Sequence, residues 1–173
     1  MEYTLETALE ILERTPQVIR SFLQGLSDDW IYHNEGPETW SPFDVVGHLI
    51  HGEKTDWTER LKIVLSEGDR KTFAPFDRFA QFEDSKNKTL NDLLLEFEQL
   101  RANNITFLKG LNLSETDYGK TGVHPALGEV TLKELLSTWV VHDLGHIVQI
   151  SRVMAKQYKD EVGPWQEYLT VLH

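Results

Sequence analysis

The chain has 173 residues, with 17 Lys and Arg against 28 Asp and Glu, a net charge of −11 and no Cys. This acidic charge argues against nucleic acid as a partner, because the few cations are scattered rather than grouped. The absence of cysteine excludes disulfides, thiolate metal clusters and a cysteine nucleophile, so metal ligands would have to be His or carboxylate.

One domain covering residues 1–173 is expected, since the length suits a single hydrophobic core and no repeat, low-complexity tract or linker divides the chain. The N-terminal segment is rich in Glu and lacks the basic and apolar regions of a signal peptide. No window approaches 18 uninterrupted apolar residues. We therefore expect a soluble, cytoplasmic protein with no membrane partner.

Apolar residues recur at helical spacing through most of the chain, and the alternation typical of half-buried strands is missing. This pattern predicts an all-α fold. Within the first helical segment, residues 4–26, Pro16 follows Thr15 and predicts a break or restart. The second helix is predicted to begin after Ser41, which suits an N-cap and is followed by proline, and to run to about Leu65.

The third helix is predicted over residues 89–110. The fourth opens with Thr131 and Glu134, which are spaced as a capping box, and is expected to continue to about Tyr158. A Gly-Pro pair at residues 163–164 then separates a short C-terminal helix.

Four long helices predict a four-helix bundle, since each has an apolar stripe to bury and no sheet to bury it against. Three connections, residues 27–40, 68–88 and 111–130, are longer than a bundle needs. Long loops in a compact domain often shape a site. The last of the three is expected to contain a small hairpin or an extended turn.

His142 and His146 are the sharpest candidates for chemistry. Four residues apart on a helix, they stand about 40° apart around the axis and about 6 Å along it, so both rings can reach one ion. They lie in the stripe expected to face the bundle interior, where a shared cation would satisfy both imidazoles. The alternative is that each ring bonds to a backbone carbonyl or a buried water, or that the stripe faces a wet cleft.

The second helix offers a third ligand in His48 or His51. Three imidazoles from two helices would leave coordination positions open, as in a catalytic metal site. The helical wheel does not choose between them. His48 is modestly favoured because Gly52, one turn away, would leave space for a bound molecule, and His51 is expected to be an exposed surface histidine. His124, in the loop before the fourth helix, is expected to stabilise that loop, with the mouth of the site as the alternative.

A second apolar strip on the fourth helix lies nearly opposite the histidines and contains Val141, Leu144, Val148 and Ala155. This helix is therefore expected to be buried on two sides. Packing within the monomer would explain the strip, and so would a two-fold contact in a homodimer.

Three segments together resemble the DinB/YfiT-like superfamily of metal-dependent enzymes: residues 40–49 (WSPFDVVGHL), 124–132 (HPALGEVTL) and 139–150 (WVVHDLGHIVQI). Their order and spacing fit along nearly the whole chain. The resemblance implies a four-helix bundle that holds one divalent metal ion through three histidines, one from the second helix and two from the fourth. By position, these ligands are His48, His142 and His146.

The resemblance also implies nickel or zinc as the ion, and a dimer in many members. Relatives include enzymes that use a low-molecular-weight thiol for transferase or isomerase chemistry, and others were proposed as hydrolases. We predict a metal-dependent S-transferase or hydrolase acting on a small-molecule substrate, with the thiol reaction preferred. A non-catalytic metal- or ligand-binding module of a stress response is the alternative. Because the chain has no cysteine, the sulfur would come from a thiol cofactor.

A divalent ion at this site would lower the pKa of a bound water or thiol and polarise an electrophile.

The roles of three polar residues are open. Asp143 is expected either to orient a metal ligand or to bond to a neighbouring helix or loop. Asp56 and Gln149 are expected to lie at the core edge or in solvent, with substrate contact as the alternative.

Overall fold

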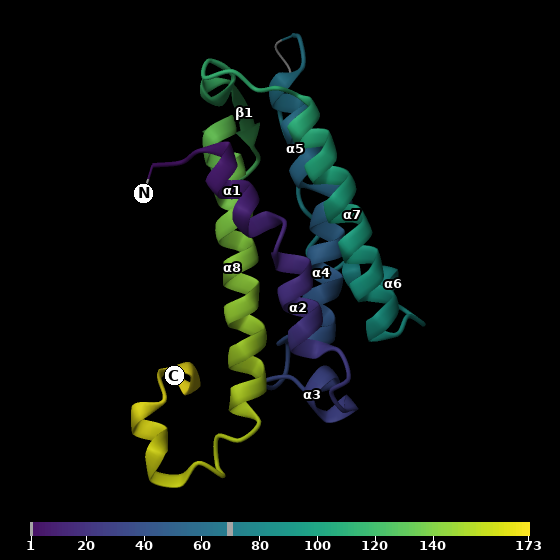
Figure 1. The fold of residues 1–173 in the computed structure, drawn as a ribbon, viewed down its shortest axis with the longest axis vertical. Helices are drawn as coiled ribbons and strands as arrows, with labels where there is room; N and C mark the ends of the chain where they lie inside the picture. Colours follow the sequence, from purple (N-terminus) through teal and green to yellow (C-terminus); the bar gives the residue numbers. More distant parts are fainter. Residues whose placement is uncertain (1, 69–70) are drawn as a thin grey trace.

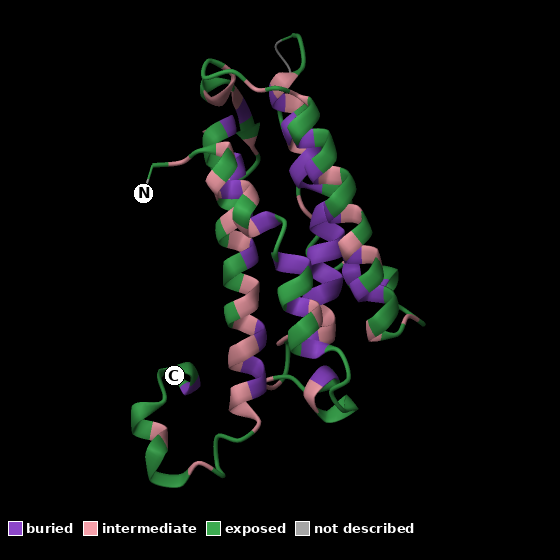
Figure 2. Cartoon of the chain, in the orientation of Figure 1, coloured by how far each residue is buried: buried purple, intermediate pink, exposed green. Residues whose placement is uncertain are grey.

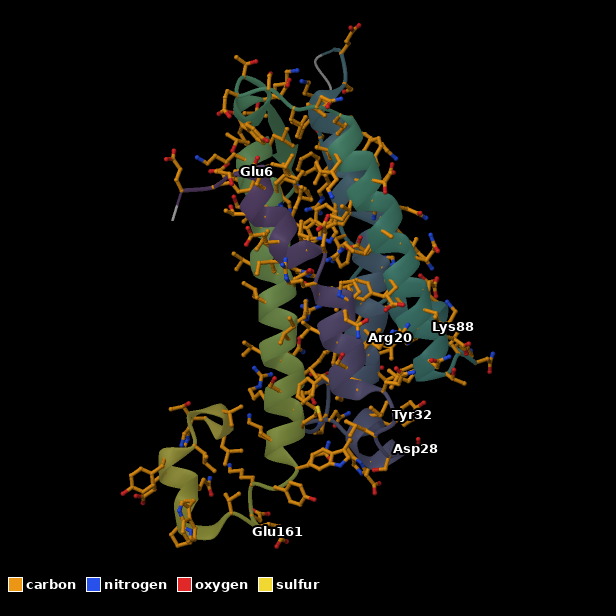
Figure 3. All side chains as sticks on the ribbon, viewed as in Figure 1. Glu6, Arg20, Asp28, Tyr32, Lys88 and Glu161 are labelled. Atoms are coloured by element: carbon orange, nitrogen blue, oxygen red, sulfur yellow. The ribbon has the colours of Figure 1, made fainter. Side chains whose placement is uncertain are left out.

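The computed structural model describes residues 2–68 and 71–173 and shows a bundle of long helices (Figure 1). The bundle confirms the predicted all-α, four-helix fold. Its helices are α1 (Leu5–Leu12), α2 (Thr15–Leu23), α3 (Asp28–Tyr32), α4 (Pro42–Thr55), α5 (Trp57–Leu65), α6 (Gln81–Asp84), α7 (Leu90–Gly110) and α8 (Leu132–Lys156). The four limbs are α1–α2, α4–α5, α7 and α8, and their side chains fill the space between them (Figure 3).

Three of the helices begin at capping boxes. Ser41, Thr89 and Thr131 each accept a hydrogen bond from the backbone N–H three residues later, and the carboxylate at that position accepts one from the cap's own N–H. Each cap satisfies donors that a helix start leaves unpaired, which is worth about 1 kcal/mol. The starts predicted for the second, third and fourth helices are confirmed.

The limbs break at two points. The predicted break near Pro16 is confirmed, since α1 ends at Leu12 and α2 begins at Thr15. The second limb, by contrast, is divided at Asp56, where φ is −114° and ψ is −73°. Here the prediction of one helix to about Leu65 was wrong.

The break at Asp56 is explained by the packing of the residue that follows it. The indole of Trp57 stacks on Trp139 of α8, with ring centroids 5.6 Å apart and planes 9° apart. A Cβ added at Gly52 would lie 3.2 Å from Trp57 Nε1, so the indole folds back against the end of α4.

The predicted long connections contain more structure than expected. Residues 27–40 include α3, and residues 71–88 include α6; residues 69 and 70 lie outside the described part. The predicted hairpin is present as β1 (Thr121–His124) and β2 (Gly128–Thr131), which pair antiparallel. It is preceded by a 3₁₀ turn over Asp117–Gly119.

The predicted C-terminal helix is instead two 3₁₀ segments, Gly163–Tyr168 and Thr170–Leu172. Short segments do not offset the cost of starting an α-helix. Leu172 is buried, and its segment packs against α8. The other segment, Gly163–Tyr168, stands away from the bundle (Figure 1).

Burial is uneven between the helices (Figure 2). Almost all of α4 is buried, whereas α8 keeps one face exposed. On that face Val141 is 66% exposed, Leu144 43% and Val148 62%, so the expectation that α8 is buried on two sides was wrong for the monomer. A homodimer stays a prediction. No helix within residues 2–68 and 71–173 combines the length and apolar character needed to cross a bilayer.

Candidate metal centre

Three histidines from two helices converge inside the bundle. His48 comes from α4, and His142 and His146 come from successive turns of α8. The Nε2 atom of His142 lies 3.2 Å from Nε2 of His48 and 3.0 Å from Nε2 of His146. One nitrogen from each ring falls within 4.8 Å of the other two. The structure thus brings the three predicted residues together.

These nitrogen distances suit a cation better than hydrogen bonds between the rings. A ring nitrogen has one in-plane position, which holds either a proton or a lone pair. His142 Nε2 faces two other Nε2 atoms and cannot bond well to both. A tetrahedral ion with metal–nitrogen bonds of 2.0–2.1 Å would hold its nitrogen ligands about 3.3 Å apart. The residues present therefore fit a divalent metal.

The hydrogen bond at the other edge of His146 fixes its protonation. Gln149 Oε1 lies 2.8 Å from Nδ1 of this ring, so Nδ1 carries the proton and Nε2 keeps its lone pair for a metal. Nδ1 of His48 and of His142 has no hydrogen-bond partner among the described residues. Gln149 is half-buried, at the core edge as expected, and from there it contacts a candidate ligand.

Packing holds the other two rings in place. Trp40 lies against His48, with ring centroids 4.8 Å apart, and Phe76 meets the same ring edge-on at 5.4 Å. Trp57 and His142 pack in an edge-to-face arrangement, with ring centroids 5.0 Å apart. These aromatic contacts restrict the rotamers of both histidines without using their nitrogen atoms.

Burial keeps the three imidazoles neutral. Loss of solvent, followed by the nearby His146, lowers the pKa of His48 to about 3 and that of His142 to about 2. Burial also lowers the pKa of His146, against the opposing effect of Gln149 and Asp143. Neutral imidazole is the form that binds metal, so at neutral pH protons do not compete for these sites.

Two cavities of different character meet at His48 and His142. One, of about 310 Å³, is mostly apolar and also reaches the hairpin; the other, of about 440 Å³, is more polar and also touches His146. The walls of the apolar cavity include Trp57, Phe73, Phe76, Leu127, Val130 and Leu135. Those of the polar cavity include Glu35, Thr39, Arg78, Gln149 and Arg152.

The polar cavity is lined by two basic and two acidic side chains, those of Arg78, Arg152, Glu35 and Glu38. Arg152 binds Glu35 through two hydrogen bonds of 2.7 and 2.8 Å. Arg78 makes no ion pair with any residue in the described part of the chain and instead lies over the ring of Trp40, at 5.6 Å. Its charge contributes to the low pKa of His48. Glu38 lines the same cavity, so the formal charges of its basic and acidic walls balance and do not by themselves favour an anion.

The prediction that His51 is an exposed surface residue was wrong. It is 7% exposed, its ring lies 5.1 Å from that of Phe76, and its Nδ1 is 3.5 Å from a carboxylate oxygen of Asp84. The segment that contains α6 covers this side of α4. His51 is thus buried but faces α6, outside the histidine cluster.

Asp143 bonds to a neighbouring helix, the second of its two predicted roles. Its carboxylate accepts two hydrogen bonds from Arg101 of α7, at 2.6 and 3.0 Å. The guanidinium of Arg101 also donates to Glu53 of α4, at 2.8 Å, and to the carbonyl oxygen of Leu12, at 2.7 Å. One buried cation therefore links α1, α4, α7 and α8, including both helices that carry the histidines.

Sequence reasoning missed this buried network. The sequence feature that indicates this network is Arg101, which lies on the same face of α7 as the buried Phe97 and Ile105. A charged residue in an apolar stripe indicates buried partners of opposite charge.

Asp56 and His124 both line the apolar cavity. Asp56 is 8% exposed and forms an ion pair with Arg60 at 2.6 Å; burial raises its pKa against the effect of that pair. Nδ1 of His124 accepts hydrogen bonds from the backbone N–H groups of Ala126 and Leu127. His124 thus stabilises its loop, as expected, and also reaches the site.

The fold and the site place the protein in one class: helical bundles in which histidines from two helices converge on a candidate metal site. The DinB superfamily model matches residues 11–150, and the chain belongs to that superfamily. Among solved structures it is similar to YfiT from Bacillus subtilis, described as a probable metal-dependent hydrolase with an unusual four-helix bundle topology. The two share 19% identity over 94% of this chain and 91% of that one, with a TM-score of 0.73, which shows a common fold. A comparison with the curated proteins gave no match.

Proposed function

We propose that this DinB-superfamily chain is a metal-dependent enzyme that holds one divalent ion, nickel or zinc, through His48, His142 and His146. The observation that carries the proposal is the convergence of three Nε2 atoms, 3.0 and 3.2 Å apart, in a buried site. Two cavities beside the cluster, about 310 and 440 Å³, suit a small-molecule substrate.

The reaction we propose is transfer of a thiol to a small electrophile, with hydrolysis as the second candidate. An ion at this site would supply an acidified thiol or water and a Lewis acid for the electrophile. Three neutral imidazoles do not compensate the double positive charge of the ion. An anionic thiolate or hydroxide is therefore the preferred occupant.

The two candidate reactions rest on different support. The chain has no cysteine, so the sulfur would come from a low-molecular-weight thiol. The resemblance to thiol-using relatives favours transfer, and the description of YfiT as a probable hydrolase supports hydrolysis.

Metal content tests the ligand assignment. Protein without a histidine tag should contain about one divalent ion per chain by elemental analysis, and His142→Ala should lose it. His51→Gln is the control, because His51 is as buried on α4 as the candidate ligand His48 but lies outside the cluster. Equal metal content in wild type and His142→Ala would refute the site.

Paired activity assays then separate the reactions. The metal-loaded protein is tested with 1-chloro-2,4-dinitrobenzene in the presence and absence of cysteine, and with p-nitrophenyl acetate. Metal-dependent, cysteine-dependent turnover would support transfer, whereas metal-dependent release of p-nitrophenol alone would support hydrolysis. Stoichiometric metal with no turnover of any electrophile or ester would favour the non-catalytic binding module.

A further inference from the structure

The hairpin places a histidine of defined protonation against the apolar cavity. His124 ends β1, and the chain reverses between it and Gly128, whose φ of +79° suits glycine. Nδ1 of His124 accepts hydrogen bonds from the N–H groups of Ala126, at 3.1 Å, and Leu127, at 3.2 Å. A nitrogen that accepts hydrogen bonds is unprotonated, so the neutral ring carries its proton on Nε2.

That Nε2–H group has no acceptor in the described part of the chain. The ring meets Phe73 edge-on, with centroids 6.4 Å apart, and is one of the walls of the apolar cavity. Burial and the charge of Arg60 lower the pKa of His124, which favours the neutral ring at neutral pH. His124 therefore offers a neutral donor beside a mostly apolar space.

The charged groups among the other walls of this cavity already have partners. Asp56 is paired with Arg60 at 2.6 Å. The carboxylate of Glu134 accepts from the N–H and hydroxyl of Thr131, at 2.7 and 2.9 Å. Thr138 also lines the cavity, but its hydroxyl can either donate or accept a hydrogen bond. It therefore does not select between substrates that carry an acceptor and substrates that carry a donor.

We propose that His124 is a specificity-determining residue, whose Nε2–H donates a hydrogen bond to an acceptor atom on an apolar substrate. The substrate class is a compact apolar molecule that carries a carbonyl or similar oxygen. Its apolar part would lie among the walls that include Trp57 and Phe73, next to His48 and His142. That this cavity holds the substrate rests on the proposed function; the binding preference of the cavity is measurable without turnover.

Two probes of similar shape test the donor. Acetophenone has a carbonyl acceptor, and ethylbenzene has none. Their affinities are measured by NMR titration, followed at the backbone amides of Leu127, Val130 and Leu135, with metal-loaded and with chelator-treated protein. Wild type should bind acetophenone about three- to tenfold more tightly, the usual gain from one neutral hydrogen bond.

Two variants separate the donor from the hairpin. In His124→Asn the shorter side chain still offers an oxygen to the turn amides, as asparagine does in turns, but removes the distant donor. The ratio of the ethylbenzene Kd to the acetophenone Kd should fall to about one. The chemical shifts of the hairpin amides should stay close to those of wild type. Thr138→Val, on the same cavity, should leave the preference unchanged.

Four results would overturn the proposal: no binding of either probe, equal affinity of both probes for wild type, an unchanged preference in His124→Asn, or ¹⁵N shifts of His124 that place the proton on Nδ1. The expected preference in a protein that shows no metal-dependent turnover would refute the proposed function while supporting the role of His124.

Discussion

Replacing the buried Arg101 with methionine should be among the most destabilising single changes in the chain. Its side chain is 2% exposed, and it neutralises two carboxylates, Glu53 and Asp143, that are both 0% exposed. Methionine fills a similar volume but leaves these two negative charges buried side by side. Removing one partner of a buried ion pair typically costs about 3–5 kcal/mol.

The expected shift in melting temperature follows from the size of the chain. For a domain of 150–250 residues, each kcal/mol changes the melting temperature by about 2–4 °C. Arg101→Met should therefore melt about 6–20 °C below wild type. The measurement is thermal unfolding followed by circular dichroism at neutral pH, with urea unfolding as a second determination of the free energy.

Arg20→Met is the matched control. Arg20 of α2, labelled in Figure 3, also forms two hydrogen bonds of 2.7 Å, both to Glu98. This pair is more accessible, with side chains 14% and 35% exposed, and such pairs contribute about 0.2–1 kcal/mol. Arg101→Met melting within about 2 °C of Arg20→Met would refute the reasoning. If the buried charges are the cause, adding Glu53→Gln and Asp143→Asn to Arg101→Met should recover part of the loss.

Three further predictions concern other parts of the molecule. Gln149→Leu removes the acceptor that holds His146 and should weaken metal affinity about 10–100-fold in a chelator competition, and unchanged affinity would exclude this positioning role. The hydrogen bond from Arg152 lowers the pKa of Glu35 in the folded protein. The ionised carboxylate therefore stabilises the fold at pH values above its unfolded pKa of about 4.3. This stabilisation is lost as the pH falls through the lower pKa of the folded state. Glu35→Gln should thus lower the free energy of unfolding by about 1 kcal/mol at neutral pH, measured by urea unfolding. If wild type and variant still differed by this amount in acid, the stabilising role of the Glu35 carboxylate would be contradicted. If the exposed face of α8 forms the predicted homodimer, light scattering should show a dimer for wild type and a monomer for Val148→Glu, and a monomeric wild type would exclude it.

The features that could be predicted from sequence are those fixed by local chemistry. Capping residues such as Ser41 and Thr131 specify helix starts within four residues of chain. The same locality explains the success with His142 and His146, because a four-residue spacing on one helix places two rings on one face whatever the rest of the fold does.

The features that could not be predicted depend on contacts between distant segments. The break at Asp56 follows from the stacking of Trp57 on Trp139, a residue of α8 that lies far later in the chain. The partners of Arg101 come from three other helices, and no local pattern identifies them. Tertiary packing determined these features. Periodicity places Arg101 in the core of α7 but does not identify its partners.

The choice between His48 and His51 shows why a helical wheel failed at the most important position. A wheel identifies an inward face only when a helix is buried on one side. Every residue of α4 from Val45 to Glu53 is buried, because α6 covers the side that α7 and α8 leave open. The packing is so close that a Cβ added at Gly47 would lie 2.5 Å from Ser85 Oγ. Both histidines are therefore interior, and only the identity of the neighbouring helix, α8 for one and α6 for the other, separates the candidate ligand from its neighbour.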